Sequence, residues 1–177
     1  MSLWKSMLGE LDHRNPLPPL HPDTIWNEEL SDDILAATSE ELVGEDVHSE
    51  LAVQLTRAGL LLWNDDLDAS HDIAQSIHDV SGAYWHAILH RREGDYENAK
   101  HWFAQVDQHP IFEPVYRQAS RLWPACQSWG QWSPNAFVDA VAEAVHVGEN
   151  DSPIGETLRR IQVVEFSFLL RHGVSAQ

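Results

Sequence analysis

The 177-residue sequence contains one cysteine, Cys126, which excludes an intramolecular disulfide and any zinc site built from several thiolates. This scarcity suits a reducing compartment, and we expect a cytoplasmic protein. No apolar run approaches the length of a bilayer span, and the N-terminus lacks a charged-then-apolar signal layout, so we expect no membrane partner. Glycine-rich phosphate loops, serine elbows and reactive-cysteine contexts are also missing, which removes the common signatures of nucleotide binding and nucleophilic catalysis.

Basic residues are scarce as well, with 11 Lys and Arg against 28 Asp and Glu and a net charge of −17. Residues 1–80 contain 17 acidic and 3 basic side chains, whereas residues 81–110 contain 4 and 3. A strongly acidic surface repels phosphate backbones, so we expect no nucleic-acid partner. The near-neutral stretch at 81–110 stands out because it holds four histidines, two tryptophans, an arginine pair and a lysine.

The apolar residues recur mostly at spacings of three and four, and no period-two strand pattern is convincing. We therefore predict an all-α fold of stacked antiparallel helical hairpins, either tetratricopeptide-like or an irregular helical bundle. Its domains would be a proline-rich N-terminal arm at 1–23 and a single all-α domain at 24–177. The predicted helices cover residues 24–37, 46–63, 66–80, 82–93, 95–108, 113–123, 134–147, and about 153 to 171, with a break at Ser81-Gly82.

A weak internal repeat appears when the chain is shifted by 29 residues. Leu67 then falls on Tyr96, and Ser70 falls on Ala99, each just after a predicted hairpin turn. The Gly94, Tyr96 and Ala99 pattern resembles the start of the second helix of a tetratricopeptide repeat, although the family's period is longer. The resemblance implies antiparallel helix pairs and carries no assignment of chemistry.

A longer motif runs through residues 84–110. It comprises YWHAI, then HRREGD, NAK and WF, and it closes on HP. This motif, with His71 and Gln75 upstream, resembles a family of uncharacterised microbial proteins that share a WHAI-HRREGD-NAK-WF-HP signature. The resemblance is strong over about residues 58–112, and it departs at His101, where an aromatic tyrosine is expected. It implies a helical fold and brings no established activity.

Two histidines of this motif, His86 and His90, are four residues apart on one predicted helix. That spacing places both imidazoles on one face, where both could bind a single divalent transition metal ion such as zinc. A further ligand could come from His71, His78 or Glu165 on a neighbouring helix. The residue after His86 is alanine, so the HExxH motif of zinc peptidases is absent. The alternative is that both rings are partly buried and hydrogen-bonded for purely structural reasons.

Arg91 and Arg92 follow in the last turn of the same helix. Cations there interact favourably with the helix dipole, which is the structural interpretation; the functional one is a fork for a carboxylate or phosphate. We expect one of them to pair with Asp95 or Glu97. Glu165 lies in the most apolar run of the chain and needs a partner, for which Arg91, Arg92 or a central histidine are the candidates.

The tryptophans and nearby aromatic residues also have two interpretations. Eight tryptophans in 177 residues is a high number, and Trp63, Trp85, Trp102 and Trp123 fall near helix ends or inner faces. They are most simply core residues, although they could also wall a cleft with the histidines at its polar end.

From these patterns we favour a helical binding module whose pocket takes a small anion or an acidic peptide end. The expected ligand-binding residues are His71, Tyr84, His86, His90, Arg91, Arg92 and Glu165. One alternative is a hydrolase-like enzyme that uses the histidine pair as metal ligands or as acid and base. The other is a scaffold whose tryptophan-rich face binds a protein partner or a second copy, forming a homodimer.

Overall fold

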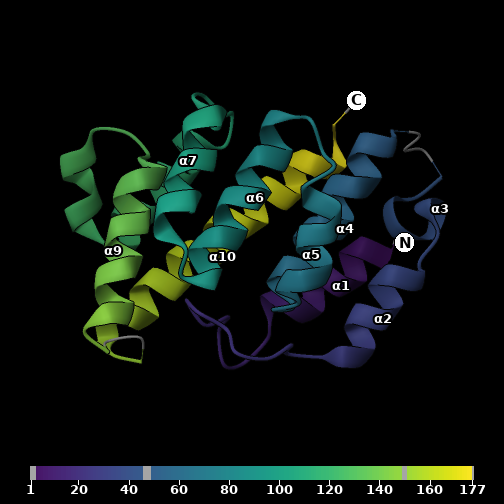
Figure 1. Ribbon diagram of the computed structural model, residues 1–177, viewed down its shortest axis with the longest axis horizontal. Coiled ribbons are helices and arrows are strands. Elements are labelled where there is room, and N and C mark those ends of the chain that lie inside the picture. Colours follow the sequence, from purple (N-terminus) through teal and green to yellow (C-terminus); the bar gives the residue numbers. More distant parts are fainter. Residues whose placement is uncertain (1–2, 46–48, 149–150, 177) are drawn as a thin grey trace.

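The computed structural model describes residues 3–45, 49–148 and 151–176 of the chain (Figure 1). Within these ranges every regular element is helical and no strand occurs, which confirms the all-α prediction. The helices are α1 (Leu3–Asp12), α2 (Glu28–Ala36), α3 (Ser39–Val43), α4 (Glu50–Trp63), α5 (Leu67–Ala74), α6 (Val80–Glu93), α7 (Tyr96–Val106), α8 (Phe112–Leu122), the 3₁₀ helix η1 (Pro124–Trp129), α9 (Pro134–His146) and α10 (Pro153–Val174).

Most predicted helices are present with boundaries shifted by a few residues, but the junction of α5 and α6 differs from the prediction. Residues 46–48, where the first long helix was expected to begin, lie outside the described residues. The predicted break at Ser81-Gly82 is wrong, because α6 already begins at Val80, where the Asp79 side chain accepts a hydrogen bond from the Ser81 amide. A Cβ on Gly82 would lie 2.5 Å from the Ile77 side chain, so glycine is needed here for close packing rather than for a turn.

The N-terminal region is more ordered than an extended arm. Residues 3–12 form helix α1, which buries Trp4, Met7, Leu8 and Leu11 in the common core. The segment after it is irregular, and the Gln162 side-chain amide on α10 donates hydrogen bonds to the carbonyl oxygens of Pro18 and Pro19. The three-and-four spacing of the apolar residues in α1 is visible in the sequence, although the prolines that follow obscure it.

The α4–α5 and α6–α7 hairpins turn in the same way at an offset of 29 residues. Asp65 and Gly94 both adopt a positive φ, of 66° and 82°. In each turn the next residue, Asp66 or Asp95, caps the following helix with its carboxylate. Its own amide donates to a carbonyl five residues earlier, which is the hydrogen bond of a Schellman turn. The internal repeat therefore has a structural counterpart at the turns, while the tetratricopeptide resemblance stays a prediction.

Helix α6 is the most enclosed element of the fold. It packs against α4, α5 and α7, while the long helix α10 passes behind the hairpins and contacts α4, α8 and α9 (Figure 1). Every residue from Ser81 to Arg92 is buried. Because no face of α6 is left to solvent, its histidines and arginines must all find their partners inside the protein.

Candidate metal centre

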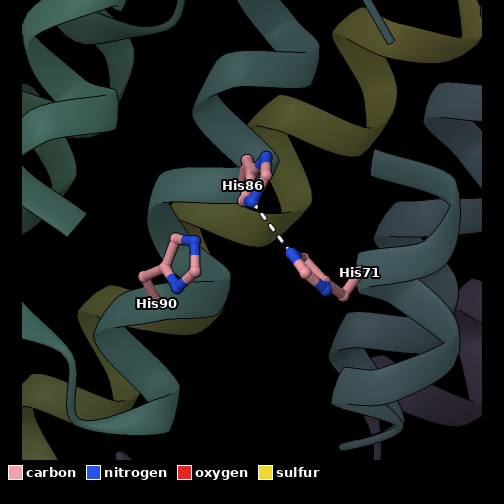
Figure 2. A group of neighbouring side chains, drawn as sticks. All are labelled: His71, His86 and His90. Carbon is pink, nitrogen blue, oxygen red and sulfur yellow. Dashed lines mark hydrogen bonds between the residues drawn. The ribbon is translucent and has the colours of Figure 1, made fainter. Parts of the chain in front are cut away.

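Three histidine rings from two neighbouring helices converge. His71 of α5 points toward His86 of α6, and His90 lies one turn further along α6 (Figure 2). The Nε2 atoms of His71 and His86 are 3.1 Å apart, and one ligand nitrogen from each of the three rings lies within 4.8 Å of the others. We call these three residues the histidine cluster. His71, His78 and Glu165 were the candidates for a further ligand, and of these only His71 joins the described cluster.

The secondary structure accounts for this convergence. His86 and His90 share a helix face because they are four residues apart, and their rings stack with centroids 4.8 Å apart. The Ser70 hydroxyl holds α5 against α4 by donating to the Ala58 carbonyl. The Trp102 indole of α7 stacks on His86 with a centroid distance of 4.0 Å and an interplanar angle of 18°. The His86 ring is thus stacked on both His90 and Trp102.

His86 is the least hydrated member of the cluster, with 5% of its surface exposed. Burial, reinforced by the neighbouring His90 and His71, lowers the pKa of His86 from 6.5 to about 4. The ring is therefore neutral at pH 7, and a neutral imidazole is the form that binds metals. Its Nδ1 atom is buried without a hydrogen-bond partner in the described part of the chain.

His90 has a defined tautomer. Its Nδ1 lies 2.8 Å from a Glu93 carboxylate oxygen, which can only accept, so Nδ1 carries the proton. Its Nε2 then accepts a hydrogen bond from the Asn98 side-chain amide at 3.2 Å. A metal ion would take over that Nε2 lone pair from Asn98 while Glu93 retains its bond. A carboxylate behind a ligating histidine is a usual feature of protein metal sites.

The spacing of the nitrogens suits a transition metal after a small ring movement. Two ligands about 2.1 Å from a tetrahedral ion lie roughly 3.4 Å apart. The His71–His86 pair at 3.1 Å already meets this spacing, while the widest separation, up to 4.8 Å, requires one ring to rotate inward. Three protein ligands leave a fourth position for water or an exogenous ligand, as in catalytic zinc sites.

The other four residues expected in the pocket lie elsewhere. Glu165 is fully buried, accepts from the Tyr84 hydroxyl at 2.8 Å and forms an ion pair with Arg91 at 2.7 Å. Arg92, also fully buried, pairs with Asp65. Asp65 also pairs with Arg14 of the N-terminal segment at 2.7 Å. We call these six residues the buried ion network.

The expected pairing of an arginine with Asp95 or Glu97 is therefore wrong. Asp95 is used as the cap of α7, and the enclosed position of α6 directs both guanidinium groups inward. Of the candidate partners for Glu165, namely Arg91, Arg92 and the central histidines, the structure pairs it with Arg91. The pairing of Arg92 with Asp65 could not be predicted from sequence, because the hairpin geometry sets the αL turn that presents this carboxylate.

Sequence reasoning missed two residues that support the cluster, Glu93 and Asn98. Glu93 follows His90 by three positions, a spacing at which helical side chains meet, so the signal was available. Asn98 reaches His90 across the α6–α7 turn and could not be anticipated from spacing alone. The core interpretation of the tryptophans holds for Trp63 and Trp85, which are fully buried, whereas Trp102 is only partly buried.

A second histidine group has a geometry that excludes a serine nucleophile. His109 Nε2 lies 3.1 Å from the Ser81 hydroxyl oxygen, while its Nδ1 accepts from the Ile111 amide. Nδ1 is therefore unprotonated, Nε2 carries the proton, and the Ser81 oxygen acts as acceptor. Burial, together with nearby His172, lowers the pKa of His109 to about 4. A base that already holds its proton toward the hydroxyl cannot activate it.

An open groove of about 490 Å³ begins beside the histidine cluster. Trp102 lines it directly, and so do Gln75 and Ala83, which lie about one helical turn from His71 and His86. Asp79 and His78 of the α5–α6 connection form part of its wall. None of the three histidines lines this groove itself, and the link between the two is Trp102, which stacks on His86.

Comparisons with known proteins identify no relative: no family model matches the chain, and no curated protein or solved structure matches it significantly. Among the described residues, no helix combines the length and apolarity needed to cross a membrane. The assignment of function therefore depends on the geometry of the site itself.

Proposed function

We propose that this chain binds one divalent transition metal ion through His71, His86 and His90, with the fourth position open to a small ligand. The observation that carries the proposal is the approach of two Nε2 atoms to 3.1 Å on adjacent helices. One N–H proton between the two rings now satisfies that pair. A metal ion would bind both Nε2 lone pairs once that proton had moved to the Nδ1 atom of its own ring. Imidazole nitrogens favour zinc, copper, nickel or cobalt over magnesium or calcium.

The burial of the cluster supports this function because it keeps the ligands ready. Because His86 is neutral, its ring needs no net loss of a proton to bind a metal ion, and its stacking on Trp102 limits ring rotation. The Glu93 carboxylate orients the His90 ring and would partly balance the charge of the ion. These features reduce the ordering cost that a flexible surface histidine would incur.

The sequence patterns favoured a site in which arginines bind an anion. In this proposal the metal ion binds the anion instead. Arg91 and Arg92 are fully buried and paired with Glu165 and Asp65, and those of their N–H groups that lack a partner are enclosed, so neither presents a fork to a ligand from solvent. The open metal position would instead take a small anion or water. Hydrolytic activity would further require a base beside the metal, and in the described part of the chain no hydrogen bond or ion pair links Asp79 or His78 of the adjacent groove to the histidine cluster. We therefore place metal and ligand binding ahead of catalysis.

Calorimetric titration of chelator-stripped protein with zinc tests the proposal. The expected result is one site per chain, lost in His71→Ala and in His86→Gln. His146→Ala removes an exposed histidine outside the cluster and should leave the stoichiometry at one. Circular dichroism should show that all variants remain helical. Failure of the wild-type protein to bind near one equivalent, or equal binding by His71→Ala, would exclude this site.

A further inference from the structure

A second groove, of about 360 Å³, lies between the N-terminal segment, α8 and α10, away from the helices that carry the histidine cluster. Its walls are largely aliphatic, formed by Leu17, Leu122, Val163 and Val164. Leu122 is 40% exposed although it is a large apolar residue. The volume is at the lower end of small-molecule sites, which span about 300–1,000 Å³. The groove therefore suits a small molecule with an apolar portion rather than a macromolecule.

Its charged lining residues have one sign. Arg121 and Arg160 line the groove and no acidic residue does, although the whole chain carries −17. Arg121 has neither a hydrogen bond nor an ion pair to any residue that the structure describes. Arg160 pairs with Glu156 at 2.6 Å, but both side chains are more than half exposed. Such a surface pair is weak and competes little with a bound anion.

We infer that this groove binds a linear aliphatic monocarboxylate, with the chain on the leucine and valine walls and the carboxylate at Arg121 and Arg160. A guanidinium presents paired N–H donors that match the two oxygens of a carboxylate. The Gln118 side chain, which also lines the groove, adds a further polar group near Arg121. This site is independent of the metal centre, since it shares no residue with it.

The competing explanation gives Arg121 a purely structural role. It lies in the last turn of α8, where a cation interacts favourably with the helix C-terminus. On that explanation, replacing Arg121 alters helix stability and leaves carboxylate binding unchanged. The two explanations therefore predict different outcomes for one variant.

Isothermal titration with hexanoate, octanoate and decanoate, below their micelle concentrations, tests the inference. Affinity should rise about fourfold for each added methylene until the groove is full, because each buried methylene contributes a fixed transfer free energy. Arg121→Gln should weaken octanoate binding at least tenfold, as expected for loss of charged hydrogen bonds. Arg117→Gln is the matched control, because Arg117 lies on the same helix, pairs with Glu113 and does not line the groove.

Two further arms separate the contributions of the carboxylate and the chain. Octanol, which has the chain without the charge, should bind at least tenfold more weakly than octanoate. Leu122→Ser changes an exposed position, so the fold should survive, and it should flatten the dependence on chain length. Equal affinity for octanol and octanoate, equal effects of Arg121→Gln and Arg117→Gln, or the absence of saturable binding would each overturn the inference.

Discussion

Helix α6 carries two buried polar groups that differ in how they are satisfied. The buried ion network, on which Arg91 and Arg92 converge, pairs each of its carboxylates with at least one guanidinium. Its remaining guanidinium surface lies over aromatic rings, with Arg91 4.7 Å from the Phe137 centroid. In the histidine cluster the rings instead face one another, and His90 alone has an acidic partner among the described residues, Glu93. Both groups retain buried nitrogens without a hydrogen-bond partner in the described chain, so the difference lies in the charges that surround them.

This difference separates structure from function within a single helix. Opposite charges that are paired and completely enclosed are out of reach of a ligand, and they hold the N-terminal segment, the α4–α5 turn and α10 to α6. Imidazole nitrogens that converge with no carboxylate between them can offer lone pairs to an ion. The sequence places both groups within seven residues, so proximity in the chain does not reveal which of them binds.

The largest expected effect comes from breaking the buried ion network. Glu165→Ala should lower the free energy of unfolding by about 3–5 kcal/mol, because it leaves the Arg91 guanidinium buried without its carboxylate. Urea denaturation followed by circular dichroism measures the loss. His71→Ala, which removes a half-buried member of the histidine cluster, should cost about 1 kcal/mol or less in metal-free protein.

Glu165→Gln is the conservative control for that experiment. It keeps the shape and an acceptor for Tyr84, so its cost should lie between wild type and Glu165→Ala. If Glu165→Ala and His71→Ala were equally mild, the ion network would not hold the helices together as described.

The second prediction concerns the loss of folding stability at acidic pH. In metal-free protein, stability should fall as the pH drops from 6.5 to 4, by about 1–3 kcal/mol for each of His86 and His109. The sign follows because the pKa values of both are lowered to about 4 in the folded state, so the unfolded chain binds protons that the folded chain does not. Unfolding midpoints across this range should fall more shallowly for His86→Gln. An unchanged slope would show that His86 titrates normally.

The smallest of the three effects sharpens the role of Glu93. Glu93→Gln should weaken zinc binding about 10- to 100-fold without abolishing it, since the carboxylate orients His90 and does not bind the ion. Glu97→Gln, an exposed acid on the next helix, is the matched control and should leave the affinity within about twofold. Equal losses in both variants would indicate a general charge effect.

The sequence supports prediction of the helices and of one face of the site. The four-residue spacing of His86 and His90 fixes their shared face, and the Gly94-Asp95 order marks the hairpin turn that the structure contains. His71 could be named only as one of three candidates, because its approach depends on how α5 packs on α6. Periodicity describes a helix, whereas the partner of each face is decided by tertiary packing.

The arginines show the limit of local reasoning most clearly. Their positions at the end of α6 suggested pairing with nearby acids, yet their partners are Glu165 and Asp65, 74 and 27 residues away. Burial of the whole of α6 changes which carboxylates the arginines pair with, because a guanidinium inside the protein needs a carboxylate that is also buried. No local sequence pattern indicates that α6 is buried on every side.

Visible absorption during titration of chelator-stripped protein with Co²⁺ tests the central claim most directly, because the spectrum reports coordination as well as binding. We expect ligand-field bands typical of a low-coordinate, nitrogen-bound ion that saturate at one equivalent and disappear when zinc is added. His71→Ala and His86→Gln should lack these bands, and His146→Ala should retain them. Bands that fail to saturate at one equivalent, or that persist in His71→Ala, would contradict a three-histidine metal centre.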